Sequence, residues 1–286
     1  MGDFIRKNEI WVFLTLGPIV SVFFVYARVQ GLFPRFVYTN GRFCILLLVL
    51  IILVKYTRGI QGVKDIFKPM LNWKVHPKWY LFSLLFAFVI GGLTLFLKGI
   101  YTAGDYSLFL KTNFGVLTFR GIVALLVWAF LGEVVWVSYC IRELSKRVKP
   151  FYASQIVGFV WTLWWIPVVI HGEGVLPGIP IVSLGIFMLG IAGMCTIVYG
   201  HSKSGLCVLL LQFALNISLN AWSVSPSTGG IPTFTAFSII YFLAMLGFMY
   251  FMNPIEKFKL YNLSKKDPIA ETTIETPEII ERVSSE

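Results

Sequence analysis

The sequence predicts an all-α membrane protein built as a bundle of about eight transmembrane helices. Of its 286 residues, 57% are hydrophobic and only 13% are charged, whereas about 25% of an average soluble domain is charged. Several apolar runs approach or exceed 18 residues with few charges, which is the length that spans a bilayer core. No segment is left over that is long and polar enough for a soluble catalytic domain. The composition therefore indicates a polytopic membrane protein.

Eight apolar segments are predicted to cross the membrane. They cover residues 9–29, 39–56, 79–99, 117–141, 152–171, 179–200, 204–222 and 233–253. Each is close to the roughly 20 residues that a helix needs to span the hydrocarbon core. The first segment is not followed by a small-residue cleavage site, so we expect a retained helix and not a signal peptide.

Lysine and arginine are distributed unevenly between the two ends of these spans. Most cations flank one set of ends, and only six flank the other: Arg28, Arg35, Arg42, Lys98, Lys111 and Arg120. Because cytoplasmic loops are enriched in Lys and Arg, we expect the cation-rich side and both termini to be cytoplasmic. The expected location is the cell (cytoplasmic or inner) membrane, with the lipid bilayer as environment. The positive charge requires no nucleic acid partner.

The chain is expected to form one transmembrane domain over residues 1–256, followed by a cytoplasmic tail over 257–286. Apolar residues at helical spacing over 60–74 predict an amphipathic helix in a cytoplasmic loop, with Pro69 as a break. The tail carries six of the 14 acidic residues and is expected to be disordered from about 267. The four cysteines occur singly in apolar runs, which fits neither a disulfide framework nor a metal site.

Glu133 is the only acidic residue inside a membrane-length segment, in the sequence WAFLGEVVWVSYCIR of residues 128–142. An ionisable group at the centre of a spanning helix costs about 3 kcal/mol or more, so it marks a functional site by default. The alternative is a protonated packing residue that forms hydrogen bonds, for which Asn216 is the expected partner.

Two other spans carry unusual side chains at helical spacing. The fifth span places three tryptophans on one helix face, and the seventh has an amide stripe at i, i+4 and i+8: Trp161, Trp164 and Trp165, then Gln212, Asn216 and Asn220. Such a stripe usually forms hydrogen bonds between helices. At about 1.5 Å per residue, however, four side chains fall within one depth band, roughly 12–20 Å from the expected cytoplasmic ends: Glu133, Trp165, Gln212 and Asn216. Polar groups that converge in this way predict a buried site.

Three segments of residues 117–222 resemble motifs of a known family. They are GEVVWVSY, which begins at Gly132, TLWWIPV around Trp165 and Pro167, and QFALN from Gln212 to Asn216. They resemble the intramembrane proteases of the CPBP family (CAAX protease and bacteriocin-processing, also called Abi). That family has Glu-Glu-x-x-x-Arg, a histidine before a proline in a Trp-rich helix, and His-x-x-x-Asn. The resemblance implies an eight-helix bundle.

The resemblance also implies that the catalytic groups are lost. With Trp136 and Tyr139 as anchors, the substituted positions and the retained carboxylate and asparagine form a vestigial site: Gly132, Glu133, Val137, Trp165, Gln212 and Asn216. In the family, the first glutamate is understood to activate a water with help from the histidines, and the asparagine stabilises an oxyanion. Gly132 has no side chain, and neither indole nor a Gln amide is a useful base. We therefore expect no intact catalytic residue, no metal and no cofactor.

The leading hypothesis is a catalytically inactive CPBP-like protein that acts as a scaffold or regulatory subunit for another membrane protein, such as a cell-envelope enzyme or sensor. The alternative is a divergent CPBP endopeptidase that cleaves a hydrophobic or lipidated peptide. The three histidines are predicted to lie away from the site, in a surface loop, at an outer helix end and in a cytoplasmic turn: His76, His171 and His201. A transporter is a weaker hypothesis, because the sequence shows no internal repeat.

Overall fold

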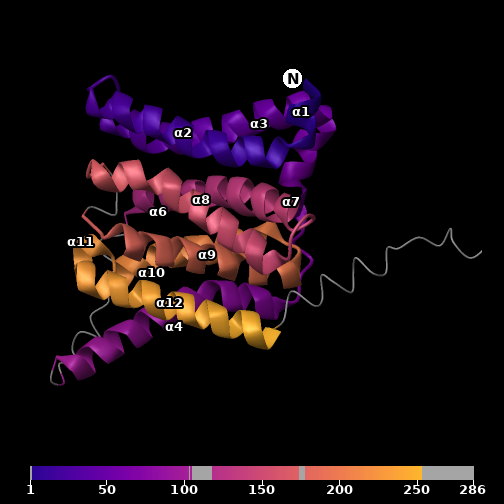
Figure 1. Cartoon of the computed structure of the whole chain (residues 1–286). Coiled ribbons are helices and arrows are strands. Elements are labelled where there is room, and N and C mark those ends of the chain that lie inside the picture. The colour runs from indigo at the N-terminus through magenta and orange to yellow at the C-terminus, as the bar shows by residue number, and fades with distance from the viewer. Residues whose placement is uncertain (1, 103, 105–117, 174–177, 253–286) are drawn as a thin grey trace, which may run out of the picture.

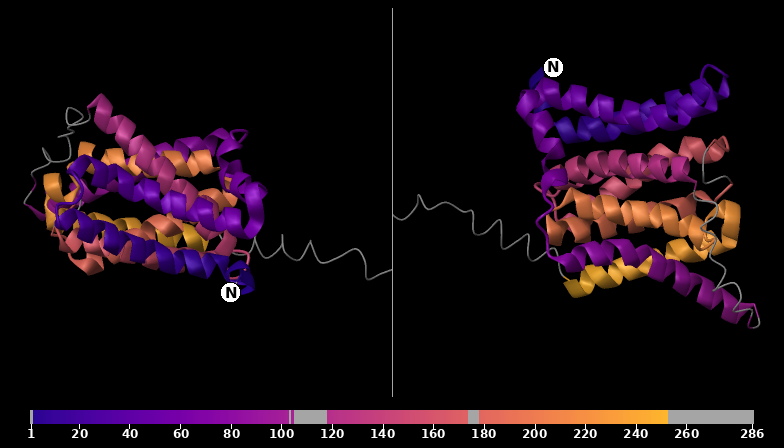
Figure 2. Two further views of the ribbon diagram at one scale, coloured as in Figure 1. Left: turned by 90° about the horizontal axis from the view of Figure 1, so that it is seen from above. Right: turned by 180° about the vertical axis from the view of Figure 1, so that it is seen from behind.

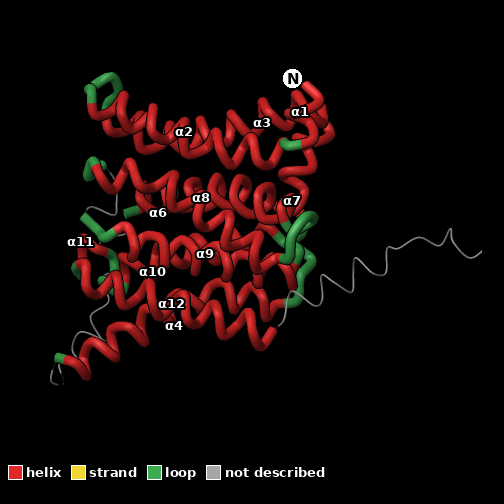
Figure 3. Tube along the Cα trace, in the orientation of Figure 1, coloured by secondary structure: helices red, strands yellow, loops and turns green. Residues whose placement is uncertain are grey.

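The protein is an all-α, multi-pass membrane protein, as predicted. The computed structural model describes residues 2–102, 104, 118–173 and 178–252. Within these ranges every regular element is a helix (Figure 3), and eight helices are long and apolar enough to cross a membrane. The predicted tail, disordered from about 267, lies outside the described residues.

The eight spans agree with the predicted segments to within a few residues at most ends. They are α2 (Glu9–Val29), α3 (Arg35–Phe67), α4 (Pro77–Tyr101), α6 (Phe119–Gly132) continued by η3 (Glu133–Ile141) and α7 (Arg142–Leu144), α8 (Pro150–Ile170), α9 (Ile181–Ser202), α10 (Gly205–Ala221) and α12 (Ile231–Met252). Three short helices lie at the ends of the bundle: α1 (Gly2–Lys7), η1 (Lys68–Leu71) and α11 (Pro226–Gly229). The hydropathy pattern therefore predicted the spans correctly.

The helices form layers with α2 and α3 on one side, α4 and α12 on the other, and α8, α9 and α10 between them (Figures 1 and 2). One end of the bundle, called here the basic end, holds α1, η1, α7 and the last turn of α12. There Arg147 donates a hydrogen bond to the carbonyl of Lys7, 3.0 Å away. The other end, called here the far end, holds the short helix α11 and the ends of α2 and α8, where Arg28 pairs with Glu173.

Helix α9 lies at the centre of the bundle. Protein buries 72% of its apolar window, against 33% for α2 and for α12. Glycines bring its neighbours close, because a Cβ built on Gly158 of α8 would lie 2.9 Å from the Cα of Leu189. A Cβ on Gly193 would collide with the side chain of Met245 in α12. Small residues that let helix backbones approach are typical of membrane interfaces.

The predicted loop helix over 60–74 is a continuation of α3. The chain bends at Gly59, whose φ of 68° lies in the left-handed region that favours glycine. The helix then resumes as far as Phe67 and tightens into η1, which contains Pro69. Its faces differ, since Ile66 is buried in the core while Lys64 is exposed. Trp73, which was expected on the apolar face, lies beyond the helix and is exposed. The helix is therefore amphipathic but shorter than predicted.

Candidate functional site

A cavity of about 370 Å³ lies between α3, α6, α8, α9 and α10. Much of its wall is apolar, with contributions from Phe43, Leu125, Phe187 and Leu215. It reaches the far end of the bundle, where Ser227 of α11 also lines it. Concave, mostly apolar spaces of roughly 300–1,000 Å³ with a few polar groups are typical of binding sites for small molecules.

Four of the six predicted site residues line this cavity: Gly132, Trp165, Gln212 and Asn216. They come from α6, α8 and α10, so the similar depths along separate helices indicated a real convergence. The helices α6 and α10 are close here, because a Cβ built on Gly132 would lie 3.1 Å from Oε1 of Gln212. The side-chain nitrogen of Gln212 is buried, and its amide lies beside the thiol of Cys195.

Glu133 is fully buried but is not among the residues that line the cavity. It is the first residue of the π-helix η3, in which residues i and i+5 stack on one face. The hydroxyl of Ser138 accordingly donates to Oε1 of Glu133 over 2.5 Å. A Cβ on Gly205 would lie 2.8 Å from the same oxygen, so the carboxyl group faces the start of α10 at the basic end. The expectation that Asn216 is its partner was wrong, because the carboxyl group faces Gly205, and Asn216 lies roughly 16 Å further along α10.

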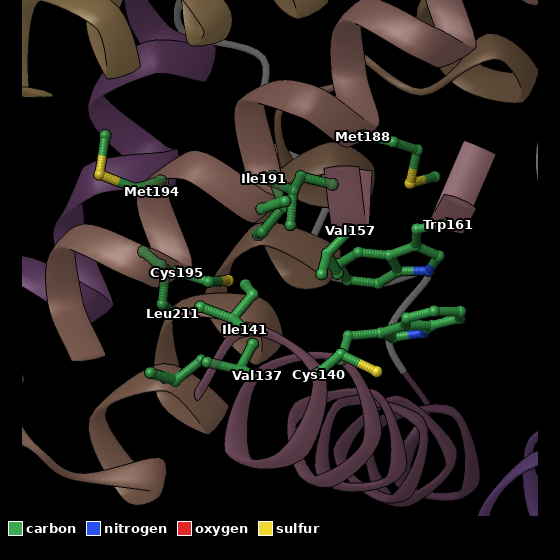
Figure 4. Close-up of a cluster of buried hydrophobic side chains, with 14 of the residues drawn as sticks. Val137, Cys140, Ile141, Val157, Trp161, Met188, Ile191, Met194, Cys195 and Leu211 are labelled. Carbon is green, nitrogen blue, oxygen red and sulfur yellow. The ribbon is translucent and has the colours of Figure 1, made fainter. Parts of the chain in front are cut away.

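Val137 also lies outside the cavity. Figure 4 shows it within an apolar cluster that includes Ile141, Cys195 and Leu211. All four side chains are at most 1% exposed. The position at which the resemblance would place an arginine therefore holds a packing residue among other apolar groups.

Arg42 is a cavity residue that the sequence analysis assigned only to the flank of a span. It is 4% exposed, and its guanidinium carbon lies 3.9 Å from the ring centroid of Trp164 and 4.3 Å from that of Trp165. Its Nε and Nη1 atoms are buried and have no hydrogen-bond partner among the described residues. The sequence already indicated Arg42 as a candidate site residue, because it lies inside the predicted span 39–56 and ionisable residues within spans mark functional sites.

A second group, called here the Glu9 cluster, joins α2, α3, η3 and α7 at the basic end. It consists of Glu9, Thr57, Arg58, Tyr139 and Glu143. Arg58 Nη2 lies 2.6 Å from Glu9 Oε1 and 3.0 Å from Glu143 Oε2, and the hydroxyl of Tyr139 donates to Glu9 over 2.7 Å. The statement that Glu133 is the only acidic residue in a span was therefore wrong, since Glu9 and Glu143 are also buried within spanning helices.

The three histidines lie outside the cavity, as predicted. His76 caps α4, His171 follows the end of α8, and His201 stacks against Trp79 with ring centroids 4.9 Å apart. Glu173 is the acidic side chain of the cavity wall, and it pairs with Arg28 at 3.4 Å. Among the described residues, no group of three or more His, Cys, Asp or Glu side chains is placed to hold a metal ion.

The cavity thus combines one buried guanidinium, three amides, the Arg28-paired carboxylate of Glu173 and a mostly apolar wall. Arginine and amide N–H groups donate hydrogen bonds, so they can bind an acceptor, whereas neither a guanidinium nor an amide is a base at neutral pH. Comparison of the chain with protein-family models, with curated proteins and with solved structures found no match. The resemblance to the CPBP proteases rests on the three motifs given above.

Proposed function

We propose that this protein is a non-catalytic, CPBP-like membrane protein that works by binding, with the cavity as its binding site. Its role is that of a scaffold or regulatory subunit for another integral membrane protein, such as a cell-envelope enzyme or sensor. One observation carries the proposal. The positions at which the resemblance implies a glutamate and two histidines line a single cavity, and they hold Gly132, Trp165 and Gln212.

The position of Glu133 also supports a binding role. A general base must reach the proton that it removes, either within hydrogen-bond distance or through one water. Glu133 is the retained carboxylate of the first motif, yet it accepts a hydrogen bond from Ser138 and does not line the cavity. Trp165 further narrows the space in which a catalytic water would have to bind.

The first test is direct. The purified protein, incubated with a hydrophobic or lipidated membrane peptide, should show no cleavage that depends on Glu133 and none that a chelator abolishes. Mass spectrometry of the reaction products measures this, with Glu133→Ala as the comparison. Cleavage by the unmodified chain that disappears in Glu133→Ala would support the divergent endopeptidase instead.

The second test fills the cavity. Leu125 and Leu126 are neighbours on α6, but Leu125 lines the cavity while Leu126 is 40% exposed on the outer surface. Leu125→Trp should remove a ligand or partner that co-purifies in mild detergent at fixed stoichiometry, because the new ring occupies the binding space. Leu126→Trp adds the same ring outside the cavity and should retain it. Equal retention by both variants would exclude the cavity as the binding site.

A further inference from the structure

We propose that Arg42 forms an oxyanion subsite, which binds the carboxylate or phosphate head of a single-chain amphiphile whose apolar chain fills the cavity. This inference rests on the proposed binding function and names the chemistry of its ligand. Three observations carry it: the depth and isolation of the Arg42 charge, its two buried donors without a hydrogen-bond partner among the described residues, and the apolar wall of the cavity that Arg42 lines.

The charge of Arg42 lies deep in the bundle. Seven residues separate it from Arg35 at the start of α3, which places it roughly 10 Å along the helix axis. Arg35 is exposed at the helix end, whereas Arg42 is only 4% exposed. Intramembrane arginines are costly and normally pair with an acid or face a functional cavity. Arg42 faces a cavity, since it is one of the residues that line the cavity wall.

The surroundings of Arg42 supply aromatic faces but no anion. The rings of Trp164, Trp165, Phe43 and Tyr38 lie within 5.9 Å of its guanidinium carbon. No carboxylate in the described part of the chain lies within ion-pair distance of Arg42. The acidic residue of the cavity wall, Glu173, pairs with Arg28 instead. Ring stacking satisfies the faces of a guanidinium and leaves its N–H groups, which lie in its plane, available.

Two of those donors are buried and without a hydrogen-bond partner in the described structure, Nε and Nη1 of Arg42. The guanidinium presents its donors as a rigid planar fork that matches carboxylate and phosphate oxygens. The indole rings of Trp164 and Trp165, which are perpendicular to each other, pack against the guanidinium and hold it in place for such an oxyanion.

The rest of the cavity fits an apolar chain. Beyond Arg42 the wall includes Phe43, Leu125, Phe187 and Leu215. The volume of about 370 Å³ accommodates roughly a dozen water-sized groups, which suits a single chain of moderate length.

The experiment measures binding of radiolabelled dodecanoate to the full-length protein in nanodiscs at pH 8, with empty nanodiscs subtracted. Binding should be saturable. Arg42→Gln should weaken it at least tenfold, because the fork and its charge are lost, and Arg42→Lys should weaken it less. Arg35→Gln removes an exposed cation from the same helix and should leave binding unchanged.

Competitors distinguish the sources of the anion and the need for the chain. Dodecyl phosphate should displace dodecanoate, whereas dodecanol should compete at least tenfold more weakly and inorganic phosphate should not compete. Equal competition by dodecanol, or displacement by inorganic phosphate alone, would overturn the proposal. Leu125→Trp provides a second variant that retains Arg42: it should abolish binding, while Leu126→Trp should not.

Absence of saturable binding, or unchanged binding by Arg42→Gln, would also overturn the Arg42 subsite. These results are distinguishable from failure of the proposed function, which would appear as Glu133-dependent peptide cleavage. A chain that neither cleaves the peptide nor binds dodecanoate would exclude this ligand class alone.

Discussion

Helix α3 carries two arginines in opposite electrostatic surroundings. Arg58, at the basic end, contacts two carboxylates, Glu9 at 2.6 Å and Glu143 at 3.0 Å. Arg42, nearer the far end, is more deeply buried, and among the described residues it has aromatic neighbours and no carboxylate. The Glu9 cluster is therefore complete in itself, whereas the Arg42 site lacks an anion.

This difference between the two arginines distinguishes a structural role from a ligand-binding role. A charge paired within the bundle joins helices, and removing one partner leaves the other without compensation. A buried cation without an anion is costly, and intramembrane cations of this kind normally face a functional cavity. We infer that the Glu9 cluster holds α2, α3 and α7 together and that Arg42 is kept for a ligand.

The largest expected effect is all-or-none and assigns each region to a side of the membrane. Because Lys and Arg favour the basic end, a reporter inserted near Arg147 or fused after Glu286 should report cytoplasm. A reporter near Ser227, beside the far end of the cavity, should report the outside. A cytoplasmic signal at Ser227 would contradict the predicted orientation.

Next in size is the loss of the Glu9 cluster. Glu9→Ala should lower the free energy of unfolding by about 3 kcal/mol, because Arg58 and the hydroxyl of Tyr139 lose their shared acceptor. Thermal melting in detergent measures this. Asp3→Ala, at an exposed acidic position of α1, serves as the control and should change little. Equal melting of the two variants would show that the cluster does not stabilise the bundle.

A smaller effect is expected at Glu133. Glu133→Ala should cost about 1–3 kcal/mol, because it removes the acceptor of the Ser138 hydroxyl within a buried π-helix. Glu133→Gln retains an acceptor of nearly the same shape and should melt close to the unmodified protein. Equal damage by both variants would show that the carboxyl group itself is needed.

The smallest expected change in stability is at Arg42, and it tests the comparison between the two arginines most directly. Arg42→Met should leave the stability of the ligand-free protein unchanged, since the lost ring stacking, about 2 kcal/mol at most, is offset by removal of an unpaired buried charge. Arg58→Met, the same substitution on the same helix, should destabilise by leaving Glu9 and Glu143 without their shared cation. A large loss of stability in Arg42→Met would assign that arginine a structural role.

The eight spans were predictable because hydropathy over about 20 residues reports membrane burial directly. The convergence of Trp165, Gln212 and Asn216 was also predictable, since helices of similar length share depth. The direction in which a side chain points from its helix was not predictable. Gly132 lines the cavity, but the carboxyl group of the next residue, Glu133, faces Gly205 at the start of α10.

Pairing between distant segments was equally hidden from the sequence. Glu9 begins the first span and Arg58 follows the predicted end of the second, so each appears to be an ordinary boundary charge. Their contact requires that α2 and α3 pack side by side. Helix η3 adds Tyr139, whose hydroxyl donates to Glu9. The position of Arg42 inside a predicted span was visible in the sequence, but its contacts with tryptophans of α8 were not.

The central position of α9 has a consequence for how freely the sequence can vary. Side chains on α2 and α12 largely face lipid, where one apolar residue replaces another at little cost, while most of α9 meets protein on every side. Even single methyl groups are constrained there. Gly193 can accept one only if the flexible Met245 moves, whereas at Gly158 the obstacle is the backbone of Leu189, which cannot yield. In a saturation mutagenesis screen, Gly158 should therefore be the less permissive of the two positions.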